Sequence, residues 1–187
     1  VNFIDGSARG LLPPGNTFYQ MKSRDTFAPI GPYIVTADEI ADPHRLQVRL
    51  WVAGALKQNF NTSDMAHKIP RCIEFVSAIH TLEPGDILAT GTNHRGLNPF
   101  MDGDTIELEC EGCGKLRIKI RDDLKRTWAR ETRLQRAERK AERKGLPGTP
   151  GVRESLRIAY QNRRRWFNRH IDLRELLHAR LFEVDER

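Results

Sequence analysis

The sequence predicts an α+β fold that is mainly β, and three observations carry that prediction. Residues 45–54, RLQVRLWVAG, alternate apolar and polar side chains, a pattern typical of a strand with one buried face. Residues 104–110 and 114–120 are expected to form two further strands around a tight turn. Apolar residues recur every three or four positions from 69 to 79, which favours one amphipathic helix among the strands.

The segments between these elements give weaker signals. The first ten residues are expected to form a strand that leads into the loop DGSARG, and LLPPGNT is expected to be a loop because its prolines and glycine disfavour both helix and sheet. PYIVT (32–36) and ILAT (87–90) predict short buried strands. NTSDM offers Ser63 or Asp64 as the N-cap of the helix, which we expect to close near LEPGD.

The composition changes after about residue 121, which predicts two parts. We expect one domain over residues 1–125 and a basic helical extension over 126–187, with a Gly/Pro break at 145–151. The net charge of +6 belongs to the second part. Residues 1–120 carry 12 Lys/Arg against 14 Asp/Glu, whereas 121–187 carry 19 against 11. Binding of a protein partner or of nucleic acid, if this chain is a non-catalytic module, is therefore expected through 121–187.

Cysteine usage and hydropathy predict a cytoplasmic protein. No apolar run approaches the length of a membrane span, and no signal pattern opens the chain. The three cysteines, Cys72, Cys110 and Cys113, are an odd number, which favours a reducing compartment over a disulfide framework. Cys110 and Cys113 form a C-x-x-C, but no second Cys or His pair stands at zinc spacing, so we expect no metal or redox role for it.

Lys22 stands before a loop that contains two prolines and a glycine between residues 26 and 32. Most lysines are simply solvated. A stiff loop, however, can hold a side chain in a fixed position for ligand binding, and a lysine held there would neutralise a carboxylate or an enolate.

Asp5 and Arg9 flank the small-residue turn GSA. In one interpretation Asp5 is a turn residue and Arg9 is a solvated arginine. In the other, Asp5 is a hard oxygen ligand for Mg²⁺ or Mn²⁺ and Arg9, close to it, binds a carboxylate. ATGTNH (89–94) has the same two interpretations: an ordinary turn, or a ligand loop in which Gly91 exposes backbone N–H groups, Thr92 adds a hydroxyl and His94 an acid or base.

Glu107, Glu109 and Glu111 alternate along one predicted strand and so share a face. Such a face can bind a metal. We favour a solvent-facing sheet edge, which charged side chains protect from pairing with other chains.

Five motifs occur in order: DGSARG, MKSRDTFAPIGPYIVTADEI, NTSDM, TLEPGDILATGTNHRG and DGDTIELECEG. Together they resemble the C-terminal catalytic domain of the fumarylacetoacetate hydrolase family over roughly residues 1–125. The resemblance implies a mixed β-sandwich roll, a divalent cation (Mg²⁺ or Mn²⁺), a small-molecule 2-oxo acid substrate and a homodimer. It also predicts an upstream segment carrying the family's Glu-x-Glu metal ligands.

The resemblance assigns roles to six positions. Asp5 matches the metal-binding aspartate, although Ile4 stands where asparagine is usual, and Thr26 matches a hydroxyl residue near the metal. Lys22 matches the catalytic lysine, with Met21 in place of a glycine. Substrate-binding residues correspond to Arg9, Gly91 and Thr92.

The implied function is a metal-dependent hydrolase or lyase that cleaves a carbon–carbon bond of an acylpyruvate-type 2-oxo acid through an enolate. Decarboxylation, isomerisation or hydration of 2-oxo dicarboxylates in the same family is the alternative. The motifs do not distinguish these reactions or identify the acyl group.

Overall fold

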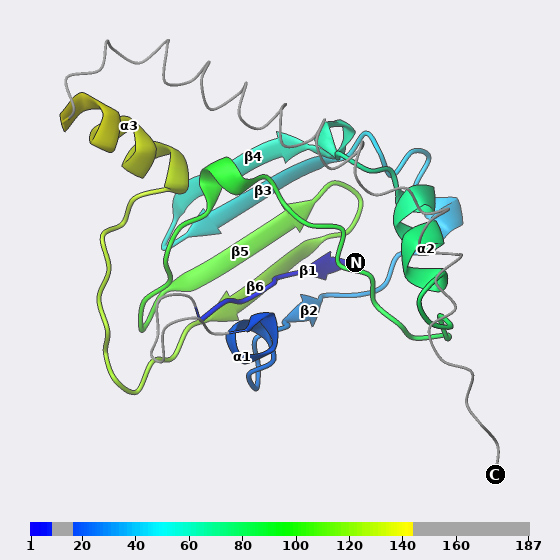
Figure 1. The fold of residues 1–187 in the computed structure, drawn as a ribbon, viewed down its shortest axis with the longest axis horizontal. Coiled ribbons are helices and arrows are strands. Elements are labelled where there is room, and N and C mark those ends of the chain that lie inside the picture. The colour runs from blue at the N-terminus through cyan, green and yellow to red at the C-terminus, as the bar shows by residue number, and fades with distance from the viewer. Residues whose placement is uncertain (9–16, 144–187) are drawn as a thin grey trace, which may run out of the picture. The chain divides into compact units, whose positions relative to one another are not determined.

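The computed structural model describes residues 1–8 and 17–143. The chain divides into two compact units, one comprising residues 1–65 and 91–136 and the other 66–90 and 137–187. The elements are short strands and helices of an α+β fold, as predicted (Figure 1). In chain order they are β1 (Asn2–Phe3), α1 (Phe18–Lys22), β2 (Ile30–Gly31), η1 (Ala37–Glu39), β3 (Gln47–Val52), β4 (Ala55–Asn61), η2 (Thr62–Asp64), α2 (Ile69–Ser77), η3 (His94–Gly96), β5 (Thr105–Cys110), β6 (Lys115–Lys119) and α3 (Arg133–Arg143), where η marks a 3₁₀ helix.

The first unit is built on a four-stranded antiparallel sheet in the order β4-β3-β5-β6. Because side chains alternate along a strand, the apolar positions of β3, β5 and β6 fall on one face. Buried residues of that face form the core, together with one residue that follows β1: Ile4, Leu50, Val52, Ile106 and Leu116. The predicted strand at 45–54 is therefore confirmed as β3, with its alternating buried face.

The opposite face of the sheet is charged. Glu109 lies 3.6 Å from Arg49 and 3.3 Å from Lys115, and Glu107 lies 3.7 Å from Arg117. The preferred prediction of a sheet edge is wrong, because β5 lies between β3 and β6. Glu109 is thus paired with cations on both neighbouring strands and Glu107 with one on β6, which suits a solvated sheet face.

The N-terminal strand is tied to the β5–β6 hairpin through a buried asparagine. Asn2 is only 2% exposed, and its side chain donates to the carbonyls of Cys113 and Gly114 and accepts from the N–H of Cys110. All its hydrogen-bonding groups that face the hairpin are thus satisfied. This anchor fixes the start of the chain against the sheet.

Three local predictions differ from the structure. Residues 32–36 and 87–90 form no strand, and Ile34 and Ile87 are exposed. The predicted helix is shorter: it begins after Lys68, with Pro70 in its first turn, whereas Ser63 and Asp64 belong to η2. Proline lacks an N–H and has a fixed φ, so it suits the first turn of a helix and disfavours its interior.

The second unit contains α2 and the end of α3. α2 has an apolar stripe, but Ile73 remains 46% exposed within the described residues. Residues 126–143, which include α3, are the described part of the predicted basic extension, and the predicted break at 145–151 lies outside the described residues. In residues 1–8 and 17–143, no helix is long and apolar enough to cross a membrane.

Candidate functional site

Backbone pairing brings the segments around Asp5 and Lys22 together. β1 pairs antiparallel with β2, so that Asn2 faces Gly31. The pairing continues beyond the strands: the N–H groups of Ile4, Gly6 and Ala8 donate to the carbonyls of Pro29, Phe27 and Met21. Residues 2–8 therefore run beside residues 21–31, and Asp5 reaches the neighbourhood of Lys22, 17 positions later in the chain.

Gly6 permits the close approach of these two segments. A Cβ atom at this position would lie 2.8 Å from the carbonyl oxygen of Phe27, closer than a Cβ can normally sit. The Gly6 N–H donates to the same oxygen at 2.9 Å. Only glycine leaves room for that hydrogen bond without displacing one of the segments.

Lys22 is the last residue of α1, a short helix that the sequence interpretation missed. Thr17 caps this helix in a capping box, accepting from the N–H of Gln20 while the Gln20 side chain accepts from the N–H of Thr17. The Thr-x-x-Gln spacing at 17–20 was the available signal. Lys22 is therefore fixed by a helix end, and not only by the stiff loop that follows it.

Lys22 and Asp5 form an ion pair through Nζ and Oδ2. The Lys22 side chain is 28% exposed and that of Asp5 is 50% exposed, so both groups remain open to a ligand. An exposed pair of this kind contributes little to stability. What the pair contributes is geometry: it places the Lys22 ammonium and the Asp5 carboxylate, a hard oxygen ligand, next to each other.

Thr26 lies in the turn opposite Gly6. Its φ of +65° is a left-handed conformation that is uncommon for a non-glycine residue. The turn is closed by the hydrogen bond from the Phe27 N–H to the Arg24 carbonyl, 3.1 Å long. Residues held in such conformations concentrate at functional sites, so the geometry is compatible with the predicted role of Thr26 near the metal.

Gly91 and Thr92 lie in an exposed loop that contacts β4. Gly91 has a φ of +86°, and a Cβ there would meet no atom of the described residues within 4 Å. The Thr92 hydroxyl donates to Oε1 of Gln58 at 2.7 Å. Gln58 is a functional candidate that sequence reasoning missed, since a single glutamine in a strand carries no local signal.

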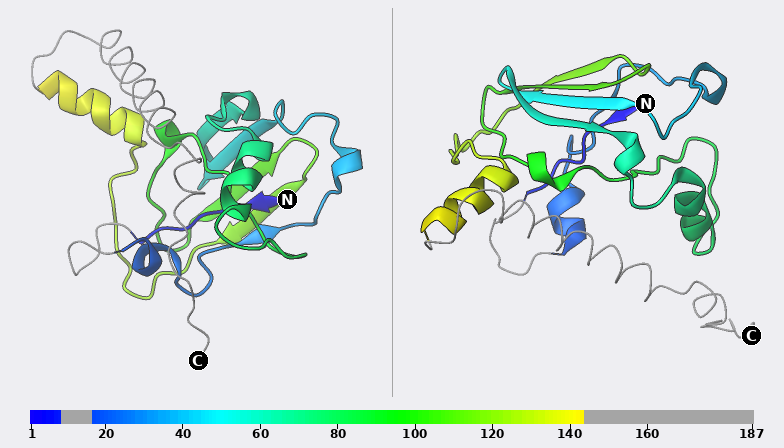
Figure 2. Two further views of the ribbon diagram at one scale, coloured as in Figure 1. Left: turned by 45° about the vertical axis from the view of Figure 1, so that its right-hand side comes forward. Right: turned by 90° about the horizontal axis from the view of Figure 1, so that it is seen from above.

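Both parts of the candidate site lie on the apolar side of the sheet. Ile4, the residue before Asp5, packs in the core on that face. Gln58 faces Leu50 across β3 and β4, and cross-strand partners share a face. Seen from above, β1, α1 and η3 all lie on one side of the sheet (Figure 2). The roles of Asp5, Lys22, Thr26, Gly91 and Thr92 remain predictions, and Arg9 lies outside the described residues.

The described residues fit a divalent cation through one carboxylate. Asp5 offers a half-exposed hard oxygen ligand beside Lys22. Among residues 1–8 and 17–143, no group of three or more His, Cys, Asp or Glu side chains could hold a metal ion. Mg²⁺ commonly takes one or two carboxylates and completes its shell with water and substrate oxygens, so Asp5 would be one ligand of such a set.

The C-x-x-C lies where β5 ends and the turn to β6 begins, and both of its cysteines are free thiols. Burial, together with the nearby Cys113, raises the pKa of the Cys110 thiol to about 12. A thiol with so high a pKa is almost entirely protonated at neutral pH, and the thiolate is the form that reacts or binds metal.

Comparison with known proteins gives consistent matches over the first two thirds of the chain. The family profile described as "Fumarylacetoacetate (FAA) hydrolase C-terminal" matches residues 1–121. The bifunctional isomerase/decarboxylase of 4-hydroxyphenylacetate degradation from Salmonella dublin is 44% identical over 97 residues, which are 52% of this chain and 22% of that protein. Maleylpyruvate hydrolase from Aquipseudomonas alcaligenes is 41% identical over 118 residues, covering 63% of this chain and 39% of the relative.

A solved structure matches as well. The crystal structure of maleylpyruvate hydrolase from Sphingobium sp. SYK-6 in complex with manganese(II) and pyruvate has a TM-score of 0.53 and 42% sequence identity, covering 58% of this chain and 40% of that one. The chain spans less than half the length of these relatives, between 22% and 40% of each.

Proposed function

The chain belongs to the fumarylacetoacetate hydrolase family, and on that premise we propose that it supplies Asp5 and Lys22 to an enzyme site that cleaves acylpyruvate-type 2-oxo acids. The observation that carries this proposal is the pairing of residues 2–8 with 21–31, which puts the Lys22 ammonium on the Asp5 carboxylate. Both residues are those that the family motifs single out.

A divalent cation, when bound, would act as a Lewis acid that stabilises negative charge on the substrate oxygens. Asp5 would be the ligand contributed by the described part of this chain, and manganese(II) in the Sphingobium hydrolase supports a cation of this class. Further oxygen ligands would come from outside the described residues, from water or from the substrate itself.

Lys22 would stabilise the negative charge that develops during cleavage. Water adds its oxygen to the acyl carbon, the bond from that carbon to C3 of the pyruvate unit breaks, and the electron pair passes into an enolate. A proton derived from the water then ends on C3, giving a carboxylic acid and a 2-oxo acid. A fixed cation beside the enolate oxygen is worth about 3 kcal/mol in comparable sites.

Substrate orientation would fall to Arg9 and to the loop at 91–92. Backbone N–H groups at Gly91 and the Thr92 hydroxyl are suited to a carboxylate or keto oxygen. Arg9 would bind the substrate carboxylate in a bidentate manner. The homodimer that the family resemblance implies also stays a prediction.

The related isomerase/decarboxylase from Salmonella favours a second candidate, decarboxylation or isomerisation of a 2-oxo dicarboxylate. Both reactions also pass through an enolate or dienolate, so the same Asp5–Lys22 pair would serve. The products distinguish them: hydrolysis releases pyruvate, decarboxylation releases CO₂, and isomerisation changes only the absorbance of the diene.

The test incubates the chain with maleylpyruvate and Mn²⁺ and follows pyruvate release. We expect turnover that Lys22→Met reduces about 100-fold, corresponding to the loss of one charge-stabilising group. Lys119→Met is the matched control, because Lys119 is an exposed lysine on β6 in the same unit. Equal rates for the two variants would refute the role of Lys22.

A further inference from the structure

The loop at 91–96 packs against a β-bulge in β4. The register between β3 and β4 shifts between Leu50 and Trp51, so that Leu50 faces Gln58 while Trp51 faces Leu56. Lys57 is therefore the extra residue of the bulge. Bulges redirect neighbouring side chains and are frequent beside active sites.

Gly96 packs directly on this bulge. A Cβ at Gly96 would lie 2.2 Å from the Lys57 carbonyl oxygen and 2.6 Å from Cγ of Gln58. The loop is thus held at contact distance from the strand. This approach places Thr92, four residues earlier, within reach of the Gln58 side chain.

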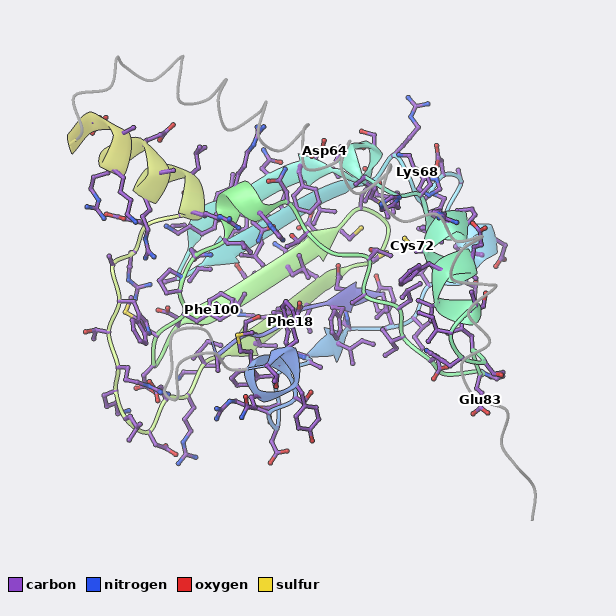
Figure 3. All side chains as sticks on the ribbon, viewed as in Figure 1. Phe18, Asp64, Lys68, Cys72, Glu83 and Phe100 are labelled. Carbon is purple, nitrogen blue, oxygen red and sulfur yellow. The ribbon has the colours of Figure 1, made fainter. Side chains whose placement is uncertain are left out.

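Two side-chain contacts attach the loop to β4 and to the helix that follows it, and a third stabilises the loop itself. Nδ2 of Asn93 lies 3.3 Å from Oδ2 of Asp64. Asp64 belongs to the 3₁₀ helix after β4 (Figure 3). Oδ1 of Asn93 accepts from the Arg95 N–H at 3.0 Å. The strongest contact is the 2.7 Å hydrogen bond between the Thr92 hydroxyl and Oε1 of Gln58.

We propose that Gln58 is a positioning residue that fixes the Thr92 hydroxyl and presents one hydrogen-bond donor to an anionic substrate. The inference rests on the proposed function, in which Thr92 contacts the substrate. Thr92 is exposed, and its hydroxyl would otherwise rotate freely. The bond to half-buried Gln58 selects one orientation.

The donor count explains why a glutamine suits this position. When Thr92 donates its proton to Oε1 of Gln58, the amide N–H₂ of Gln58 is left to donate outward. When the amide is flipped, its N–H₂ donates to Thr92, whose own O–H is then the outward donor. Either arrangement offers a donor to a carboxylate or keto oxygen, whereas a glutamate would keep the acceptor and lose the donor.

Isothermal titration with pyruvate, in the presence of excess Mn²⁺, tests this through a double-mutant cycle. Gln58→Met and Thr92→Val are each expected to weaken pyruvate binding about tenfold, and the double variant to bind no more weakly than either one. Additive losses, or no loss for Gln58→Met, would overturn the proposal. Asn59→Ala, the next residue on β4 and on the opposite face of the sheet, is the control and is expected to bind like the parent chain.

Two further measurements separate positioning from folding and from the proposed function. Gln58→Glu should keep the parent melting temperature and weaken pyruvate binding at least tenfold, since it preserves only the acceptor; binding at the parent level contradicts the inference. In ligand-free NMR spectra, Thr92→Val should shift the side-chain amide resonances of Gln58, and unmoved resonances overturn the contact. If those resonances move but the parent chain binds no pyruvate, the proposed function fails, and the role of Gln58 in substrate binding fails with it.

Discussion

Replacing Gly6 with alanine tests whether the close approach of residues 2–8 to 21–31 builds the site. The new Cβ would stand 2.8 Å from the Phe27 carbonyl oxygen and 3.3 Å from Cα and Cβ of Phe27. Carbon–oxygen contacts in proteins usually settle near 3.3 Å or beyond, so the segments would have to separate by about 0.5 Å. The 2.9 Å hydrogen bond between them would then lengthen past the usual range.

The energetic cost follows from these distances. Overpacking costs about 1–3 kcal/mol and the weakened hydrogen bond about 1 kcal/mol. Alanine lowers the conformational entropy of the unfolded chain, which stabilises the folded state by about 0.5–1 kcal/mol. This gain applies here because Gly6 does not have a positive φ that would strain alanine. We expect a net destabilisation of about 2 kcal/mol, or a melting temperature lower by about 4–8 °C.

Thermal unfolding and maleylpyruvate turnover should be measured on the same samples, at a temperature where the variant stays folded. We expect turnover to fall at least tenfold, because displacement of the segment moves Asp5 away from Lys22. Ser7→Ala, at an exposed neighbouring position, should leave the melting temperature within about 2 °C of the parent. Turnover and stability both unchanged in Gly6→Ala would refute the account of how the segments meet.

Three further predictions concern the metal, acid stability and thiol reactivity. Asp5→Asn should abolish saturable Mn²⁺ binding measured by electron paramagnetic resonance, whereas Asp123→Ala, at an exposed position, should not. Burial alone raises the pKa of Asp104, but hydrogen bonds from Arg130 and the Met101 N–H lower that pKa on balance below its usual value of 3.8. The stability that this carboxylate contributes is full above about pH 4 and is lost as the pH falls through its lowered folded-state pKa. Asp104→Asn should therefore flatten the fall of the melting temperature below about pH 4, and an unchanged slope would contradict this. Cys110, with a pKa raised to about 12 by burial, should react with iodoacetamide at pH 7.5 more than tenfold slower than glutathione, and a comparable rate would show that the thiol is accessible and ionised.

Alternation and turn chemistry predicted three of the four strands of the central sheet, β3, β5 and β6. Leu50 and Val52 show why β3 was identified: apolar residues two apart are buried on one face. β4 was missed because ALKQNFN has no alternation, and it is stabilised by its pairing with β3. Tyr33 and Ile34 led to the opposite error, because their apolar side chains suggested a buried strand but lie exposed in a segment that pairs with no strand of the described residues.

The family motifs singled out two residues of the candidate site that lie in contact, but not the contacts that support them. Family motifs pointed to Asp5 and Lys22, and the structure brings the two into contact. Nothing local in the sequence shows that Gly6 must pack on Phe27 or that Gln58 faces Thr92, because both contacts depend on long-range backbone pairing. The capping box at Thr17 is the exception, a readable local signal that was overlooked.

Paramagnetic broadening by Mn²⁺ in the NMR spectrum of this chain tests most directly whether Asp5 and Lys22 form one cation and substrate site. With substoichiometric Mn²⁺ and pyruvate, the amide signals of Gly6 and Lys22 should broaden first, and Asp5→Asn should abolish the effect. First broadening at Glu107 and Glu109 on the opposite face of the sheet, or broadening that Asp5→Asn leaves unchanged, would contradict the account.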